Sequence, residues 1–375
     1  MREYLVVFGV ALGVTFLLAS LARQLAYKLH AVAKVRDRDV HAIPTPYFGG
    51  PAMLGGLIAA YLVATNLPFL SGADEAMFGD VLAVIVGGTV ICIVGVIDDL
   101  YELDALSKFA GQVLASIIVV AMGVQFVYLP LYGNYLGLDQ AQAMIFTVLM
   151  IVGTANAVNF VDGLDGLAAG MVAIGAVAFF IYAYVLAVEN GETRAIAAAL
   201  LTAALAGVCI GILPHNFFPA RMFIGDSGSM FIGFVLACSA ISLTGQFPAT
   251  SLSEGVGGAQ ANFLSALLPL ILPLTMLLVP FVDLVLAVAR RTRAGRSPFS
   301  PDKMHIHHRL LEIGHSHRRA VLVMYMVSAL VAFGSVVISL FGGWQSIGGF
   351  AFLAVITAAV IFWLPRLGAR QGVKP

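Results

Sequence analysis

Residues 159–170 read NFVDGLDGLAAG, and strongly apolar sequence lies on both sides of them. No charged residue occurs from Met144 to Val158, and none occurs between Asp165 and Glu189. Flanks of this kind are typical of helices that cross a bilayer, which need about 20 mostly apolar residues. Because an isolated ionised carboxylate is costly to bury in lipid, a simple membrane anchor does not account for an Asn and two Asp here. We therefore interpret the stretch as a functional segment at a membrane boundary.

The composition of the whole chain also indicates a membrane protein. Of its 375 residues, 60% are hydrophobic and 11% are charged, whereas soluble domains carry about 25% charged residues. We interpret residues 1–375 as one integral membrane domain, with the N-terminal segment as an uncleaved first span. The three cysteines lie singly in apolar stretches, without a CxxC pair, and are interpreted as packing residues.

Charge-poor runs predict an all-α polytopic protein with about eleven transmembrane helices. The predicted spans are residues 4–22, 48–67, 80–97, 108–126, 140–158, 165–187, 194–213, 227–245, 261–288, 320–340 and 346–364. Between two of them, residues 125–138 alternate aromatic and other residues around Gly133-Asn134, which predicts a small outer β-hairpin.

The positive charges predict the orientation. With the N-terminus outside and the C-terminus in the cytoplasm, every Lys and Arg except Arg2 and Arg194 lies on the cytoplasmic side, as do all eight His. This cationic excess marks the cytoplasmic face and gives no indication of nucleic-acid binding. The candidate active-site loops all lie on that face, at about residues 23–47, 98–107, 159–165, 214–226 and 289–319.

One acidic pair, Asp98-Asp99, ends the third predicted span. Two solvated charges that cap the following helix near Leu106 would explain it. Adjacent carboxylates also suit a general base, or a pair that shares a cation. The third acid, Asp104, comes two positions too late for the DDxxD motif of soluble prenyl-diphosphate synthases.

In the opening stretch, Asn159, Asp162 and Asp165 recur every three residues, so on a helix they would form one inclined stripe. Gly163, Gly166 and Gly170 would leave that surface open to close approach by a helix or a ligand. An Asp that caps the apolar helix 167–187 is the alternative. A cap explains one Asp but not three polar residues, which favours a functional site.

The segment GDSGS, residues 225–229, places Asp226 at the start of the eighth predicted span. A helix cap with local hydrogen bonds from Ser227 and Ser229 would explain it. A helix N-terminus with small residues and a carboxylate also suits a metal–phosphate pair. The sequence alone leaves both explanations open.

A histidine cluster, His305, His307 and His308, follows Asp302 and precedes Arg309 in the last inner loop. Zinc binding is one interpretation, although no cysteine lies nearby. Hydrogen bonding to a diphosphate, assisted by Arg309, suits the set better than zinc or a merely solvated loop.

Taken in order, TPYFGG, IDD, NFVDGLDGLAAG, FIGDSGS and HIHH resemble the polyprenyl-phosphate N-acetylhexosamine-1-phosphate transferases. These integral membrane enzymes move a sugar-1-phosphate from a UDP-sugar to a lipid phosphate and release UMP. The resemblance runs from about Asp39 to Arg319. His-Ile-His-His resembles the GlcNAc-1-phosphate branch rather than the branch that makes the first peptidoglycan lipid, which carries three consecutive His.

The resemblance implies Mg²⁺, with Mn²⁺ as an alternative, held by Asp226 with Asp98 and Asp99. It also implies that Asp98 and Asp99 serve the acceptor phosphate, with Asp98 as the candidate base.

Further roles follow from the same resemblance. Asp162 and Asp165 would belong to the catalytic motif, Asn159 and Asn216 would bind the nucleotide-sugar, and His305, His307 and His308 would contact the diphosphate or the sugar. Arg221 and Arg309 are added to this binding set from charge and position alone.

The implied reaction is transfer of GlcNAc-1-phosphate from UDP-GlcNAc to undecaprenyl or decaprenyl phosphate at the cytoplasmic face of a bacterial plasma membrane. It would be the first membrane step of a cell-envelope glycan, and family members often form homodimers. The alternatives are a phospho-MurNAc-pentapeptide or other N-acetylhexosamine donor and, in another class, a secondary transporter. A transporter predicts mid-span acids and repeated halves, whereas these acids lie at span ends and no repeat is found.

Overall fold

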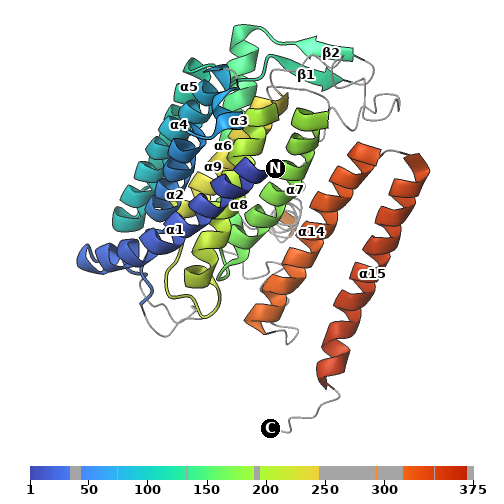
Figure 1. Cartoon of the computed structure of the whole chain (residues 1–375). Helices are drawn as coiled ribbons and strands as arrows, with labels where there is room; N and C mark the ends of the chain where they lie inside the picture. The colour runs from blue at the N-terminus through green and yellow to red at the C-terminus, as the bar shows by residue number, and fades with distance from the viewer. Residues whose placement is uncertain are drawn as a thin grey trace.

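The computed structural model shows a mostly helical protein (Figure 1). It describes residues 1–33, 44–73, 75–131, 134–189, 195–244, 292–293, 316–341 and 343–369. The predicted span 261–288 and the histidine cluster His305, His307, His308 with Arg309 lie outside the described residues.

Each of the other ten predicted spans corresponds to a helix in the structure. The helices are α1 (Arg2–Lys28), α2 (Gly49–Ala64), α3 (Pro68–Ser71), α4 (Glu75–Tyr101), α5 (Ala105–Ala121), α6 (Gln140–Val161), α7 (Leu167–Glu189), α8 (Ala195–Asn216), α9 (Gly225–Thr244), α14 (His317–Phe341) and α15 (Gly343–Ala369). Among the described residues, seven helices are long and apolar enough to cross a membrane, and three apolar helices are shorter. These helices agree with a polytopic membrane protein.

Two short strands connect α5 to α6. β1 (Tyr128–Leu131) pairs antiparallel with β2 (Asn134–Gly137), so that Tyr128 lies opposite Gly137. Both strands fall inside the segment for which the sequence predicts a hairpin. The strands follow the C-terminal end of α5 and precede the N-terminal end of α6, so they lie at the opposite end of these helices from Asp104 and Asn159.

The helices α8 and α9 lie at the centre of the bundle, and nearly all of their side chains are buried. Such burial suits helices that are apolar around their whole circumference. α8 packs against α1 and α7, whereas α9 packs mainly against α4 and α6. α14 packs on α7, and α15 packs on α14 at the edge of the bundle (Figure 1).

Glycines allow α2 and α4 to approach the first turn of α9 closely. A Cβ atom on Gly50 would lie 2.4 Å from the backbone C of Ser227, and one on Gly95 would lie 2.3 Å from its Cα. A side chain at either position would therefore separate the helices. This close packing accounts for a glycine of the TPYFGG motif and fixes where α9 begins.

Candidate active site

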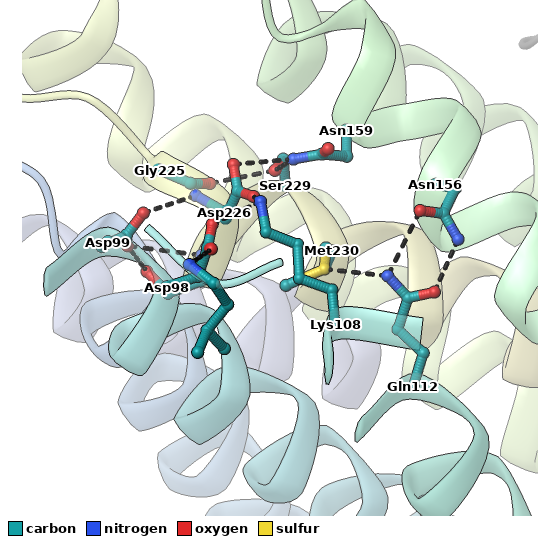
Figure 2. A network of polar contacts seen from close by, with 12 residues as sticks. Asp98, Asp99, Lys108, Gln112, Asn156, Asn159, Gly225, Asp226, Ser229 and Met230 are labelled. Carbon is teal, nitrogen blue, oxygen red and sulfur yellow. Dashed lines mark hydrogen bonds and ion pairs between the residues drawn. The ribbon is translucent and has the colours of Figure 1, made fainter. Parts of the chain in front are cut away.

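The C-terminal ends of α4 and α6 meet the N-terminal ends of α5 and α9, and polar side chains from all four helices form one network (Figure 2). α4 supplies Asp98 and Asp99, and α9 supplies Asp226. Asn159 comes from the last turn of α6, and Lys108 comes from the first turns of α5. Residues far apart in the sequence are thus brought to one place.

Asp99 caps the N-terminus of α9 from another helix. Its Oδ1 accepts a hydrogen bond from the backbone N–H of Asp226 at 2.8 Å, and its Oδ2 accepts one from the hydroxyl of Ser227 at 2.7 Å. Gly225, at φ +69°, lies against this carboxylate, because a Cβ there would be 2.5 Å from Oδ2. Free N–H groups at a helix start favour an acidic partner. Asp99 therefore has a defined structural use at the site.

The carboxylate of Asp226 faces the other side chains of the network. Its Oδ2 lies 2.7 Å from Lys108 Nζ, and its Oδ1 accepts a hydrogen bond from Asn159 Nδ2 at 3.0 Å. Asn159 also donates to the hydroxyl of Ser229 at 2.8 Å, and Ser229 in turn donates to the carbonyl of Gly225. Because Asp99 caps the helix, the side chain of Asp226 is available for a cation.

Asp98 and Asp226 share the ammonium group of Lys108. Lys108 Nζ lies 2.6 Å from Asp98 Oδ2 and 2.7 Å from Asp226 Oδ2. The other oxygen of Asp98 accepts a hydrogen bond from the backbone N–H of Leu103 at 2.7 Å. The sequence allowed the Asp98-Asp99 pair to cap the following helix, but the N-cap is Asp104, whose carboxylate accepts hydrogen bonds from the N–H groups of Leu106 and Ser107. Asp98 is thus directed at a cation.

The acidic pair fits Mg²⁺ by its donor chemistry. The carboxylates of Asp98 and Asp226 already share the Lys108 ammonium. Mg²⁺ is usually bound by one or two carboxylates together with waters and substrate phosphates, so this pair offers suitable oxygen ligands. Within the described part of the chain, no group of three or more His, Cys, Asp or Glu is placed to hold a metal. Asp98 and Asp226 have the carboxylate oxygens that a Mg²⁺ site requires, and their role as metal ligands stays a prediction.

The opening motif does not form a continuous helical stripe. α6 ends at Val161 and Asp162 is its C-cap, so only Asn159 of the three polar residues lies on that helix. The glycine that follows Asp162 and the turn to Gly166 break the helical spacing. Burial raises the pKa of Asp162 well above its usual value, and the nearby carboxylates of Asp226 and Asp99 raise it further. Asp162 thus belongs electrostatically to the acidic network.

Asp165 and Asn216 lie in a second polar cluster. Asp165 accepts a hydrogen bond from the backbone N–H of Ala220 at 2.9 Å, and its own N–H donates to His317 Nε2 at 3.2 Å. Asn216 accepts from the N–H of Gly166 at 3.0 Å and donates to a carbonyl of the loop before α9. The carbonyl of Gly166 also accepts a hydrogen bond from the hydroxyl of Tyr325. These bonds hold the turn between α6 and α7 against the end of α8, the α8–α9 loop and α14.

Arg221 is exposed in this same loop, and its backbone N–H donates to the carbonyl of His215 at 2.8 Å. Its guanidinium could therefore reach a ligand from the surface. The buried ring of His215 contacts the carbonyl of Phe16 on α1 at 3.1 Å. The roles assigned to Arg221 and to the histidine cluster stay predictions.

Sequence reasoning did not single out Lys108 or His317. A lone Lys at the start of an otherwise apolar helix, ten residues after an Asp, is a signal that could have found Lys108. His317 begins α14 and stacks on Phe218 with ring centroids 4.4 Å apart. No local sequence pattern indicates that contact, because it joins segments that are distant in the chain.

The fold and the site define a polytopic helical membrane protein with an acidic centre that holds the Lys108 ammonium. The family described as "Glycosyl transferase family 4" matches residues 81–244, which contain most of that centre. The chain belongs to this family. Over 371 residues, 98% of this chain and 90% of the relative, it is 43% identical to the decaprenyl-phosphate N-acetylglucosaminephosphotransferase of Mycobacterium tuberculosis.

Two further relatives carry the names of two different activities. A Bacillus subtilis protein named "Probable undecaprenyl-phosphate N-acetylglucosaminyl 1-phosphate transferase" is 32% identical over 92% of this chain and 88% of its own length. The phospho-N-acetylmuramoyl-pentapeptide-transferase of Desulforudis audaxviator is 31% identical over 88% of this chain and 97% of its own length.

Proposed function

We propose that this protein transfers GlcNAc-1-phosphate from UDP-GlcNAc to a polyprenyl phosphate, decaprenyl or undecaprenyl, and releases UMP. The product is polyprenyl-diphosphate-GlcNAc, the first lipid-linked intermediate of a cell-envelope glycan. The observation that carries the proposal is the Asp98–Lys108–Asp226 arrangement, in which one cation lies between two carboxylates. The 43% identity to relatives named for GlcNAc transfer, against 31% for a MurNAc-pentapeptide transferase, supports GlcNAc as the sugar.

The reaction requires the acceptor phosphate to attack the sugar-linked phosphorus of UDP-GlcNAc. A new P–O bond forms there, the P–O bond to the bridging oxygen breaks, and UMP leaves with the electron pair. Such transfers depend on positioning and on neutralising negative charge. Mg²⁺ would be held by Asp98 and Asp226, whose carboxylates contact the Lys108 ammonium in this structure, and it would supply charge neutralisation to the diphosphate.

The protein's own groups have distinct tasks in this scheme. Lys108 adds fixed positive charge next to the two carboxylates, where the phosphates would bind. We assign to Asp98 the task of accepting a residual proton from the acceptor phosphate, whose second ionisation lies at about pH 6. Asn159 orients Asp226 through a 3.0 Å hydrogen bond, and Asp99 holds the helix that carries it.

The position of the site in the membrane completes the proposal. The distribution of Lys and Arg supports a cytoplasmic location, in a bacterial cell, for the C-terminal ends of α4 and α6. A soluble nucleotide-sugar and a lipid phosphate can meet at that boundary. We also propose eleven spans, an outer hairpin, and a homodimer as the oligomeric state.

Purified protein in detergent tests the function directly. It should release UMP from UDP-GlcNAc in the presence of decaprenyl phosphate and Mg²⁺, and release should stop with EDTA. Parallel reactions with UDP-MurNAc-pentapeptide separate the two donors, and undecaprenyl phosphate separates the two acceptors. Absence of UMP from every UDP-N-acetylhexosamine would refute the proposal.

The Asp226→Asn variant tests the proposed metal ligand. We expect it to fold, to elute as wild type does, and to lose both activity and its response to Mg²⁺, because the amide removes one anionic ligand. Full activity in this variant would exclude Asp226 as a metal ligand.

A further inference from the structure

A pair of side-chain amides lies one helical turn away from the acidic network (Figure 2). Gln112 Nε2 donates to Asn156 Oδ1 at 3.3 Å, and Asn156 Nδ2 donates back to Gln112 Oε1 at 2.5 Å. Gln112 also contacts Met230 Sδ at 3.1 Å and is 1% exposed. These contacts join α5, α6 and α9 at one point.

Each helix at this junction also carries a residue of the network. Gln112 follows Lys108 by four positions on α5, and Asn156 precedes Asn159 by three on α6. Residues three or four apart share one face of a helix. Met230 directly follows Ser229, the hydroxyl that accepts a hydrogen bond from Asn159. The amide pair therefore lies directly behind the residues that contact Asp226.

A pair of apolar side chains could fill the same space. Buried amides are favourable only when they are hydrogen-bonded, and a reciprocal pair satisfies both partners in one relative position of the two helices. The mutual bonds of Gln112 and Asn156 thus select one axial position of α5 against α6. That position decides how far Lys108 lies from Asn159.

Building on the transferase function proposed above, we propose that Gln112 is a positioning residue that acts through Asn156. It holds Lys108 and Asn159 on opposite sides of Asp226 so that both contact the same carboxylate. Neither amide needs to touch the substrates for this role. The inference is specific to the α5–α6 contact and does not depend on which prenyl chain is used.

A steady-state comparison of variants tests the role. Gln112→Leu should lower kcat about tenfold, as loss of an orienting residue typically does, while KM for UDP-GlcNAc stays near the wild-type value. The control is Thr147→Val on α6, which removes a buried hydroxyl bonded to Phe126 and Ala143 at the far end of the helix. A merely structural effect would lower stability in both variants and leave kcat per folded molecule unchanged.

A swap of the two amides supplies the rescue test. Gln112→Asn shortens one side chain and should lose activity, and Asn156→Gln in the same protein lengthens the partner and should restore most of kcat. The proposal is wrong if Gln112→Leu matches Thr147→Val in kcat, or if the double swap is no better than Gln112→Asn. If the wild-type protein releases no UMP, the transferase function itself is wrong. If the wild type is active and the variants keep its kcat, only the positioning role of Gln112 is wrong.

Discussion

Asp98 and Asp99 are neighbours in the sequence, yet their side chains have different tasks. Asp98 faces the ammonium of Lys108, whereas Asp99 caps α9 by accepting a hydrogen bond from the N–H of Asp226, 127 residues later. The sequence predicts both as site residues, but it cannot predict this division, because the capping partners of Asp99 come from α9. The sequence left open whether Asp226 caps its own helix, and the structure shows that Asp99 accepts the hydrogen bonds of that helix start.

Replacing Lys108 tests the charge at the centre. We expect Lys108→Met to lower kcat by about a hundredfold, because it removes the ammonium that contacts both Asp98 and Asp226. Lys108→Arg keeps the charge but changes its shape, so an intermediate kcat is expected. UMP release measures the effect, and Lys28→Met, at the end of α1, controls for loss of a cytoplasmic charge. Wild-type kcat in Lys108→Met would contradict the assigned role.

The raised pKa of Asp162 predicts that the free energy of unfolding depends on pH. Its pKa in the folded protein is raised by burial and by neighbouring carboxylates, so the folded state binds more protons than the unfolded state above about pH 4. Stability should therefore fall as the pH rises from that value toward the raised pKa. Asp162→Asn lacks this penalty, so its gain in Tm over wild type should be negligible near pH 4 and largest at pH 8.

The Asp162 measurement uses thermal unfolding in detergent with EDTA, so that no cation neutralises the carboxylates. Equal or lower Tm for Asp162→Asn at pH 8 would show that its charge is not unfavourable. Activity of the same variant reports separately on catalysis.

At the scale of helices, hydropathy predicts the structure well. Ten of the predicted spans coincide with described helices because burial in lipid requires a continuous apolar backbone segment with internal hydrogen bonds. The end of α6 is the informative exception. The spacing of Asn159, Asp162 and Asp165 suggests a helix, but two glycines and contacts with α8 and α14 end it at Val161. Tertiary contacts of this kind leave no local pattern.

The glycines that bring α2 and α4 to α9 predict a steric effect. Gly50→Ala or Gly95→Ala would place a Cβ within about 2.5 Å of the Ser227 backbone, and overpacking typically costs about 1–3 kcal/mol. We expect a lower Tm and lower kcat, because the displaced helix carries Asp226. Gly153→Ala on α6, where nothing lies within 4 Å, is the control and should be neutral or slightly stabilising. Unchanged kcat in both Ala variants would show that the site tolerates displacement of α9.

For the whole molecule, the charge distribution predicts the orientation in the membrane, and the structure shows which residues meet at each end of the helix bundle. Asp98, Asp226 and Lys108 meet at one end of the bundle, and the β1–β2 hairpin lies at the other ends of α5 and α6. A charge count alone could not place these residues in contact. It could only assign them to the same side, since positive residues indicate the side of each loop and not the packing of helices.

Cysteine labelling tests this orientation. The native Cys92, Cys209 and Cys238 are buried, so their background should be low. In intact spheroplasts, a membrane-impermeant maleimide should label Gln140→Cys, which follows the hairpin, and should label Leu106→Cys only after permeabilisation. Both positions are exposed. Labelling in the reverse order would place the acidic network outside the cell.

The contacts of α9 also bear on how the protein is made. Lys108 and Asp226 are 118 residues apart, and Asp99 precedes the N–H group that it caps by 127 residues. During synthesis, Asp98, Asp99 and Lys108 are therefore made well before the segment that carries Asp226. A ribosome-bound or truncated chain that stops before Gly225 therefore contains no assembled centre. A chain that lacks α9 should therefore release no UMP, so activity would indicate that the bundle is complete through α9.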